Sequence, residues 1–257
     1  MHFPKISVIT PSYNQVDFIG QTIESVLSQD YPDLEYIIMD GGSTDGTPDI
    51  LRRYDGKIIW ESEEDKGQSD AINKGLRLAS GDIVTYLNSD DLCEAGALKK
   101  VGESFRDNPQ TMWLCGKCRI IDQDNREFYR PITRFKNFWL KRYGYWRLLA
   151  INFISQPAVY WRREIMGEIG YLNCNLDYAL DYEYWVRIGK KFEPAIVDEY
   201  LASFRIHPAT KGSTGYTKQF REELDVARKH SPRLLPVLLH YLTYAGIVTS
   251  YTFLKRV

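Results

Sequence analysis

Short apolar runs alternate with amphipathic segments along the first hundred residues. Four runs rich in β-branched residues have the length of buried strands, at 6–10, 34–39, 57–61 and 83–87. Apolar residues between them recur at helical spacing, for example over 19–27 and 71–79. Strands separated by helices of this length predict a parallel sheet with right-handed crossovers. We therefore expect an α/β fold whose open, mostly parallel sheet is flanked by helices.

The alternation weakens after residue 112. Met112–Ile121 predicts another strand, closed by a turn at 122–125, and Ser155–Trp161 predicts an edge strand because it contains a proline. The aromatic and basic stretch Phe135–Arg147 is expected as a helix or loop, and Asp181–Ile188 as a helix. No repeat or linker interrupts the chain. We expect one domain over 1–215, with halves at 1–110 and 111–215, and a C-terminal helical extension over 216–257.

The C-terminal stretch Leu234–Leu254 contains no Asp, Glu, Lys or Arg, whereas basic residues precede and follow it. It has about the 20 residues that a bilayer-spanning helix needs. Proline, histidine and several hydroxyl residues within it make a poor spanning helix, and its tyrosines suit a membrane interface. We expect an interfacial helix or one packed on the protein, with residues 233–257 offering peripheral contact to an anionic membrane.

Composition places the chain among soluble globular proteins, with 44% hydrophobic and 26% charged residues. A net charge of -1 argues against a nucleic-acid partner, which needs a basic footprint. Cys115 and Cys118 have the spacing of a zinc or redox pair, but no second pair or nearby histidine accompanies them. Three positions apart in a strand, their thiols would lie on opposite faces. We expect a cytoplasmic protein, peripheral at most on the inner face of the membrane.

The strand predicted at 83–87 ends in Asn88-Ser89-Asp90-Asp91. Open α/β sheets bind ligands at the carboxyl ends of their strands. Two adjacent carboxylates repel each other unless a cation, protons or donors hold them, and oxygen ligands suit Mg²⁺ or Mn²⁺. The pattern predicts a metal that carries a phosphate-bearing substrate.

Asp40 also ends a strand and is followed by two glycines, which allow a ligand to approach the backbone closely. Its carboxylate can accept hydrogen bonds from a base or ribose, or it can close the strand as a turn residue, as Asp45 can. Residues 41–46 match neither the dinucleotide nor the triphosphate loop. A diphosphate would then be neutralised by a metal and by side chains such as Arg205 or Lys211.

Four segments, in this order, resemble the family-2 inverting glycosyltransferases of the GT-A fold. They are Ile6–Asn14, Asp40–Thr47, Asp65–Gly75 and Asn88–Asp91, of which the third resembles the bacterial polysaccharide-biosynthesis branch. The resemblance covers roughly residues 5 to 210 and weakens after 120. It implies a Rossmann-like sugar-nucleotide-binding half over 1–110 and an acceptor-binding half over 111–215.

The resemblance also implies roles for single residues. Thr10, Pro11 and Tyr13 would cradle the nucleoside, while Asp40 holds the pyrimidine edge and Asp65 contributes to the same pocket.

On the metal side, the resemblance makes Asp91 the principal ligand, with Asp90 facing the ribose and metal and His207 near the metal and diphosphate. Asn73 would contact the donor, although Ile72 replaces an arginine that many relatives carry beside it.

The catalytic base is sought among Asp177, Asp181 and Glu183. The family often has Glu-Asp at the start of this helix, and its Asp takes the proton. Here Leu180 replaces the Glu, so the base is assigned to Asp181, with Glu183 as the second choice. The alternative for Asp181 is a carboxylate that only favours the helix N-terminus through its dipole.

The sequence is thus interpreted as a metal-dependent inverting glycosyltransferase that adds one sugar per event. We expect a nucleotide-diphosphate sugar as donor, with uridine diphosphate favoured, and Mn²⁺ or Mg²⁺ as cofactor. The acceptor would be a hydroxyl of a saccharide or lipid-linked saccharide in cell-surface polysaccharide or glycolipid biosynthesis. A non-catalytic carbohydrate- or sugar-nucleotide-binding relative and a sugar-nucleotide-forming nucleotidyltransferase remain as alternatives. A phospho-receiver domain would need only about half this length.

Overall fold

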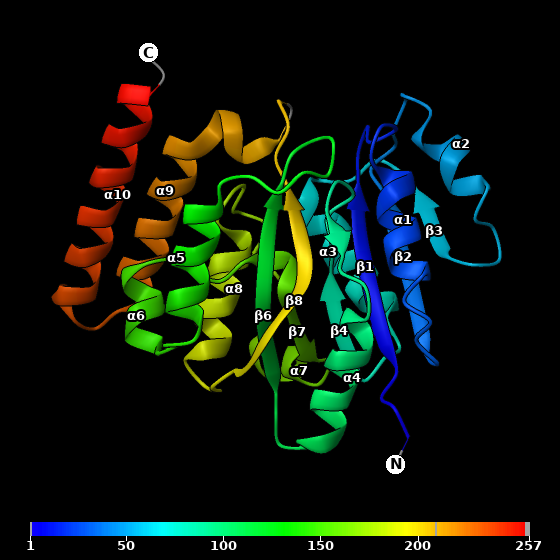
Figure 1. Ribbon diagram of the computed structural model, residues 1–257, viewed down its shortest axis with the longest axis horizontal. Helices are drawn as coiled ribbons and strands as arrows, with labels where there is room; N and C mark the ends of the chain where they lie inside the picture. Colours follow the sequence, from blue (N-terminus) through cyan, green and yellow to red (C-terminus); the bar gives the residue numbers. More distant parts are fainter. Residues whose placement is uncertain (1, 209, 255–257) are drawn as a thin grey trace.

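The computed structural model describes residues 2–208 and 210–254, with strands and helices alternating as far as β4 (Figure 1). The strands are β1 Ile6–Ser12, β2 Leu34–Asp40, β3 Ile59–Ser62, β4 Ile83–Tyr86, β5 Leu92–Cys93, β6 Trp113–Ile121, β7 Val159–Arg162 and β8 Ala195–Arg205. The helices are α1 Ile19–Leu27, α2 Thr47–Arg52, α3 Gln68–Leu78, α4 Ala97–Asp107, α5 Arg130–Leu140, α6 Tyr145–Ala150, α7 Ile165–Ile169, α8 Leu180–Gly189, α9 Lys211–His230 and α10 Leu234–Leu254, with a short 3₁₀ turn η1 at Gln156–Ala158.

All eight strands form one sheet in the order β3-β2-β1-β4-β7-β6-β8-β5. The first four in this order are parallel, as the apolar runs predict, so their carboxyl ends share one edge of the sheet. β7 runs antiparallel between β4 and β6 and joins the two halves of the chain. The sheet is therefore continuous across both predicted halves.

Helices cover both faces of the sheet, and each face has its own apolar core. One core contains the buried sides of α1, α2 and α4, and the other contains those of α3, α6, α7 and α8. Cys115 and Cys118 lie in different cores, so the two thiols of β6 occupy opposite faces, as their spacing predicts.

The predicted edge strand Ser155–Trp161 is wrong in position and in extent. Pro157 lies in η1, ahead of the strand, and β7 begins only at Val159. The missing proline N–H is therefore not required by the ladder, and β7 can occupy the interior of the sheet. The aromatic stretch Phe135–Arg147 forms parts of two helices, α5 and α6.

The C-terminal helices pack on the second half of the protein. The expected boundary at 215 falls inside α9, which begins at Lys211. α10 packs on α6 and α9, on the side of the molecule away from β1 and β2 (Figure 1). Over the described residues, no helix combines the length and the apolar character needed to cross a membrane.

Because α3 packs closely on the sheet at Gly75, we expect a methyl group added there to destabilise the protein. A Cβ added at Gly75 would lie 2.5 Å from Ile9 Cγ2, within the core. We expect Gly75→Ala to lower the free energy of unfolding by about 1–3 kcal/mol, since an overpacked core must shift to accept the atom. Urea denaturation measures the change. Gly167→Ala in α7 is the control, because a Cβ there meets nothing within 4 Å. Equal stabilities of the two variants would contradict the packing described.

Candidate functional site

Asp40 ends β2 with a carboxylate that is already hydrogen-bonded. Its Oδ2 accepts from the Ser43 N–H at 2.9 Å and the Ser62 hydroxyl at 2.6 Å, and its Oδ1 accepts from the Ser43 hydroxyl at 2.5 Å. Asp45 is similarly used, because its Oδ1 accepts from the backbone N–H and hydroxyl of Thr47. The geometry thus favours the strand-closing alternative for both residues. The predicted contact of Asp40 with a pyrimidine edge would require one of these bonds to be shared or replaced.

Tyr13, Gly41 and Asp65 lie together beside Asp40, and this group of residues is called the slot. A Cβ added to Gly41 would lie 2.6 Å from Asp65 Oδ2 and 3.4 Å from Tyr13 Cδ2. The Tyr13 side chain is 61% exposed, so its ring can be approached from solvent. Asp65 Oδ1 accepts a hydrogen bond from the Gly67 N–H at 2.7 Å, which orients the carboxylate. An aromatic ring, a close backbone and a carboxylate together suit a flat, hydrogen-bonding group.

Two other residues of the predicted cradle do not reach this slot. Thr10 is buried within β1, and its hydroxyl is hydrogen-bonded to the Tyr36 hydroxyl at 3.0 Å. Pro11 is likewise buried in the strand. Both residues therefore lie within the sheet behind Tyr13, and their direct contact with the nucleoside stays a prediction.

Asp91 is fully buried, with both carboxylate oxygens used inside the protein. Oδ1 accepts from the Arg205 backbone N–H at 2.9 Å and Oδ2 from the Asn88 amide at 3.2 Å. Burial, with repulsion from Asp90, raises the pKa of Asp91 well above its usual range. Asp91 is thus held by protein groups in this structure, and its role as the principal metal ligand stays a prediction.

Asp90 faces the other way and meets His207. Its Oδ2 lies 3.0 Å from His207 Nε2, while the His207 ring packs against the Phe18 ring at 4.5 Å between centroids. The two atoms form a hydrogen bond or ion pair at this distance, and both are of a kind that can bind a divalent ion. No three His, Cys, Asp or Glu side chains in the described part gather as a complete cage. The pair fits an ion that also takes phosphate oxygens, as Mg²⁺ does.

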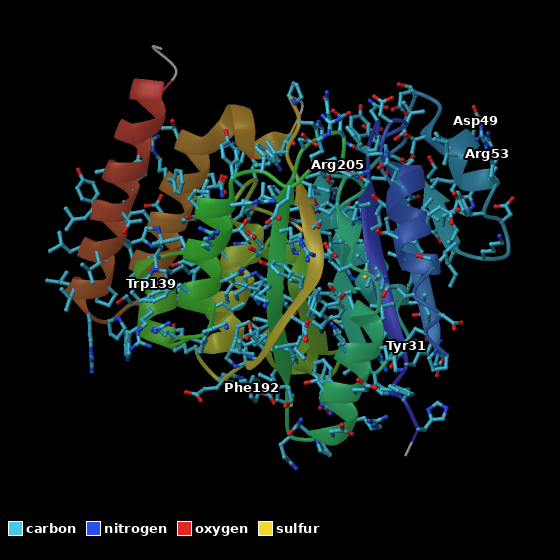
Figure 2. The ribbon with its side chains drawn as sticks, in the orientation of Figure 1. Tyr31, Asp49, Arg53, Trp139, Phe192 and Arg205 are labelled. Atoms are coloured by element: carbon cyan, nitrogen blue, oxygen red, sulfur yellow. The ribbon has the colours of Figure 1, made fainter. Side chains whose placement is uncertain are left out.

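Arg205 was expected to neutralise a diphosphate, but its guanidinium group is hydrogen-bonded within the protein. Nε donates to the Asp90 carbonyl at 2.6 Å, and the two terminal nitrogens donate to Asn125 Oδ1 and Gln21 Oε1 at 2.5 and 3.2 Å. Figure 2 shows Arg205 at the end of β8, beside the strand ends of the first half. Arg205 thus holds the loop that carries Asp90. Lys211 opens α9, with its ammonium 5.2 Å from the centre of the Tyr178 ring.

Asp181 lies in the first turn of α8, as predicted, and its Oδ1 accepts from the Tyr182 N–H at 2.7 Å. Burial raises the pKa of Asp181 above its usual range. The Tyr86 hydroxyl, at the end of β4, has a raised pKa from its burial and then from the charges of Asp181 and Asp91. Asp181 is therefore within electrostatic reach of the strand end that carries Asp90 and Asp91.

The other candidate bases are engaged elsewhere. Glu183 forms a two-point ion pair with Arg187, with contacts of 2.8 and 2.9 Å, and is buried. This ion pair within α8 makes Glu183 the less accessible of the two candidate bases, and its role stays a prediction. Asp177 is exposed and paired with Lys218.

Asn73 is buried and does not present its amide to the site. Its Nδ2 donates to the Leu172 carbonyl at 2.9 Å, and its Oδ1 accepts from the Leu172 N–H at 3.0 Å. Asn73 thus holds the loop before α8, and its contact with the donor stays a prediction.

Sequence reasoning missed several polar groups at this edge. A chain of amides links Gln68, Asn88 and Gln156, with Gln68 Nε2 2.8 Å from Asn88 Oδ1 and Asn88 Nδ2 3.3 Å from Gln156 Oε1. The hydroxyl of Ser12, the last residue of β1, is buried without a hydrogen-bond partner. Ser12 and Asn88 lie in segments that resemble the family motifs, so their position near the site could be predicted. Their hydrogen-bond partners could not be predicted from the sequence.

A buried acid also lies behind Asp181. Glu223 of α9 accepts at Oε1 from the Asn152 amide at 3.0 Å and from the Gln219 amide at 3.2 Å. Its Oε2 is 3.9 Å from His240 Nε2 of α10. Burial, with a further contribution from Asp181, raises the pKa of Glu223 to about 7. No motif in the sequence marked it.

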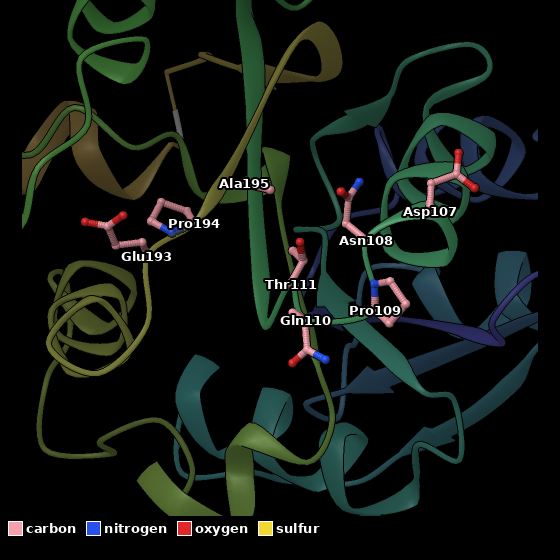
Figure 3. Close-up of a pocket in the computed structure, with 8 residues that line it drawn as sticks. All are labelled: Asp107, Asn108, Pro109, Gln110, Thr111, Glu193, Pro194 and Ala195. Carbon is pink, nitrogen blue, oxygen red and sulfur yellow. The ribbon is translucent and has the colours of Figure 1, made fainter.

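A surface cavity of about 460 Å³ lies away from these residues (Figure 3). It is formed by the loop after α4 and the start of β8, with Asp107 and Glu193 as its charged residues. These segments precede the amino ends of β6 and β8, so the cavity is at the sheet edge opposite Asp90 and Arg205.

Comparisons with known proteins agree with the motifs. Residues 7–170 match the model of the family described as Glycosyl transferase family 2. The chain is 48% identical over 208 residues to TuaG of Bacillus subtilis, a putative teichuronic acid biosynthesis glycosyltransferase, covering 79% of each protein. It is 28% identical over 249 residues to a PGL/p-HBAD biosynthesis glycosyltransferase of Mycobacterium tuberculosis, covering 93% of this chain and 91% of that protein.

Solved structures share the fold. The mannosyltransferase PcManGT of Pyrobaculum calidifontis, in complex with GDP-Man and Mn²⁺, has a TM-score of 0.70 at 21% identity, covering 95% of this chain and 70% of that one. TarS 1-349 of S. aureus, in complex with UDP-GlcNAc, has a TM-score of 0.66 at 20% identity, covering 86% and 66%. The chain spans 39% of a longer TarS chain. The expected GT-A fold is confirmed.

The buried Glu223 predicts a pH-dependent stability. Its pKa rises from 4.5 to about 7 on folding, so the stability it contributes is complete below pH 4.5 and is lost as pH rises through 7. Glu223→Gln keeps the neutral form at every pH. We expect the variant to exceed the parent in free energy of unfolding by on the order of 2–3 kcal/mol above pH about 8, and to approach it in acid.

Urea denaturation across pH measures this difference, with Asp225→Asn, an exposed acid of the same helix, as control. A Glu223→Gln variant that was less stable than the parent in alkaline solution would contradict the assignment.

Proposed function

The chain belongs to glycosyl transferase family 2, and from this premise we propose that it is a metal-dependent inverting enzyme acting on nucleotide-diphosphate sugars. One sugar is moved in each event to a hydroxyl of a saccharide or lipid-linked saccharide. The relative TuaG, named for teichuronic acid biosynthesis, supports a role in cell-surface polysaccharide or glycolipid synthesis.

The proposal rests on one arrangement at the carboxyl edge of the sheet. The slot of Tyr13, Gly41 and Asp65 lies past the ends of β1 and β2, and the Asp90–His207 pair lies past the ends of β4 and β8. Because these strands are neighbours in the sheet or joined by hydrogen bonds at their ends, the two features share one edge. In this proposal the nucleoside lies at the slot, the diphosphate at the metal pair and the sugar on the side of Asp181.

The slot is assigned to the base of the donor. Asp65 Oδ2 faces Gly41, where it can accept an N–H of uracil stacked on Tyr13. We favour uridine diphosphate, and guanosine diphosphate is the competitor, because guanine also offers N–H donors. Solved relatives of this fold were crystallised with UDP-GlcNAc and with GDP-Man.

Asp90 and His207 are assigned to Mn²⁺ or Mg²⁺, and Asp91 to holding their loop. When bound, the ion offsets the negative charge that develops on the departing diphosphate. The solved relative PcManGT was crystallised with Mn²⁺. Asp90 also faces the ribose side in this assignment, as the resemblance implied.

Asp181 is assigned as the general base. Its carboxylate takes the proton of the acceptor hydroxyl as that oxygen attacks the anomeric carbon from the side opposite the nucleotide. The bond to the diphosphate breaks as the new glycosidic bond forms, so the configuration inverts in a single displacement. The raised pKa of Asp181 suits this role, because a more basic carboxylate accepts the proton more readily.

Replacing the base tests the reaction. We expect Asp181→Asn to lower kcat by about 10²–10⁴-fold, because the acceptor proton loses its carrier, while donor binding is retained. Release of uridine diphosphate in the presence of Mn²⁺ measures turnover, and calorimetry measures binding. Asp177→Asn is the matched control, since this nearby acid is exposed and ion-paired with Lys218. Full turnover by a folded Asp181→Asn protein would refute the assignment. Parent protein that binds donor sugar without any turnover would indicate a binding module.

Substitutions at Asp90, His207 and Asp91 distinguish the proposed roles of the two adjacent acids. We expect Asp90→Asn and His207→Ala each to raise the Mn²⁺ concentration for half-maximal turnover by about 10–100-fold. Asp91→Asn should leave that concentration within a few-fold of the parent, because the buried side chain bonds only to protein. Titration of activity with Mn²⁺ gives all three values. The reverse order of effects would restore Asp91 as the principal ligand.

A further inference from the structure

One face of α10 exposes a row of large apolar side chains. The residues are between 45% and 88% exposed and comprise Leu234, Leu235, Leu238, Leu239, Tyr241 and Leu242. The other face of the same helix is fixed to the protein, because Pro236 and His240 are buried and His240 Nδ1 lies 3.0 Å from the Leu149 carbonyl oxygen. Over 234–242, where side-chain exposure is described, the helix is therefore packed on one side and uncovered on the other.

The uncovered surface continues onto α5 and α6. Phe135 and Phe138 of α5 and Trp146 of α6 are exposed by 39% or more. The Arg233 guanidinium, just before α10, lies 4.6 Å from the centre of the Trp146 ring and joins the two parts. Figure 1 shows α5, α6 and α10 on the same side of the molecule, and Figure 2 shows side chains projecting outward from α10. We call the exposed side chains of 130–150 and 233–242 the docking face.

The segments that form the docking face carry basic residues and no acidic ones, which favours an anionic partner. Residues 130–150 contain six Lys or Arg and residues 226–254 contain three, and neither segment contains Asp or Glu. Seven of the chain's 33 basic residues and none of its 34 acidic residues lie in 130–150 and 233–242, although the net charge is -1. Two of the seven, Arg130 and Lys141, pair with acids of neighbouring segments, Glu127 and Asp198. A second copy of this face would bring like charges together, which disfavours a symmetric dimer.

We propose that the docking face seats the protein on an anionic lipid surface without spanning it. The leucines and aromatic rings would enter the boundary between headgroups and acyl chains, while the arginines and lysines contact lipid phosphates. The sequence alone suggested only the C-terminal stretch, whereas the structure adds α5 and α6 and shows which side of α10 is free. The inference is independent of the reaction proposed above, because it concerns residues outside the site.

Vesicle flotation of the full chain tests the proposal. The parent should float with vesicles of phosphatidylcholine and phosphatidylglycerol in equal amounts, and far less with phosphatidylcholine alone. Leu235→Ser with Leu238→Ser should weaken binding by about tenfold, since two apolar anchors are lost. Arg142→Gln with Arg233→Gln should weaken it by about 25-fold at low salt, at about fivefold for each charge.

The matched control carries Ile59→Ser with Leu78→Ser, two residues of similar exposure on other elements. Circular dichroism confirms that each variant is folded, and light scattering reports its oligomeric state. Absence of flotation by the parent, or equal loss in the control and docking-face variants, would overturn the proposal. A dimer that the leucine pair dissolves, without vesicle binding, would assign the face to a second copy of the chain.

Discussion

A buried carboxylate ties together strands that lie far apart in the sequence. Asp91, just past β4, accepts a hydrogen bond from the backbone of Arg205 at the end of β8, and its own carbonyl accepts one from the Thr22 hydroxyl of α1. Arg205 in turn donates to the carbonyl of Asp90. Since an unpaired acid in this position would be costly to bury, these bonds specify a single arrangement of the loop. The outward direction of Asp90 and its approach to His207 follow from it.

The sheet and its functional edge could be predicted because they depend on local patterns. Apolar runs alternating with helices define parallel strands, and parallel strands bring Asp40 and Asp90 to one edge whatever their separation in sequence. Which of two adjacent acids faces solvent depends instead on partners more than a hundred residues away. The same reason applies to Asn73 and Glu183. The Asn73 amide is hydrogen-bonded to Leu172, and the Glu183 carboxylate is paired with Arg187, which the sequence pattern did not indicate.

The second half was harder to predict because its strands are not in βα units. β7 enters the sheet in the opposite direction, and the proline that suggested an edge strand ends up in the turn before it. Glu223 carries no sequence signal, because an acid in an amphipathic helix is ordinarily exposed. The packing of α9 against α6, α8 and α10 removes it from solvent, and the charge of Asp181 acts on it there.

Gly41 allows the Asp65 carboxylate to lie directly against the backbone, because the first atom of any side chain at position 41 would collide with that carboxylate. Every amino-acid replacement at this position adds at least that one carbon. Glycine is therefore the one residue that allows the Asp65 carboxylate to pack directly on the backbone at this position.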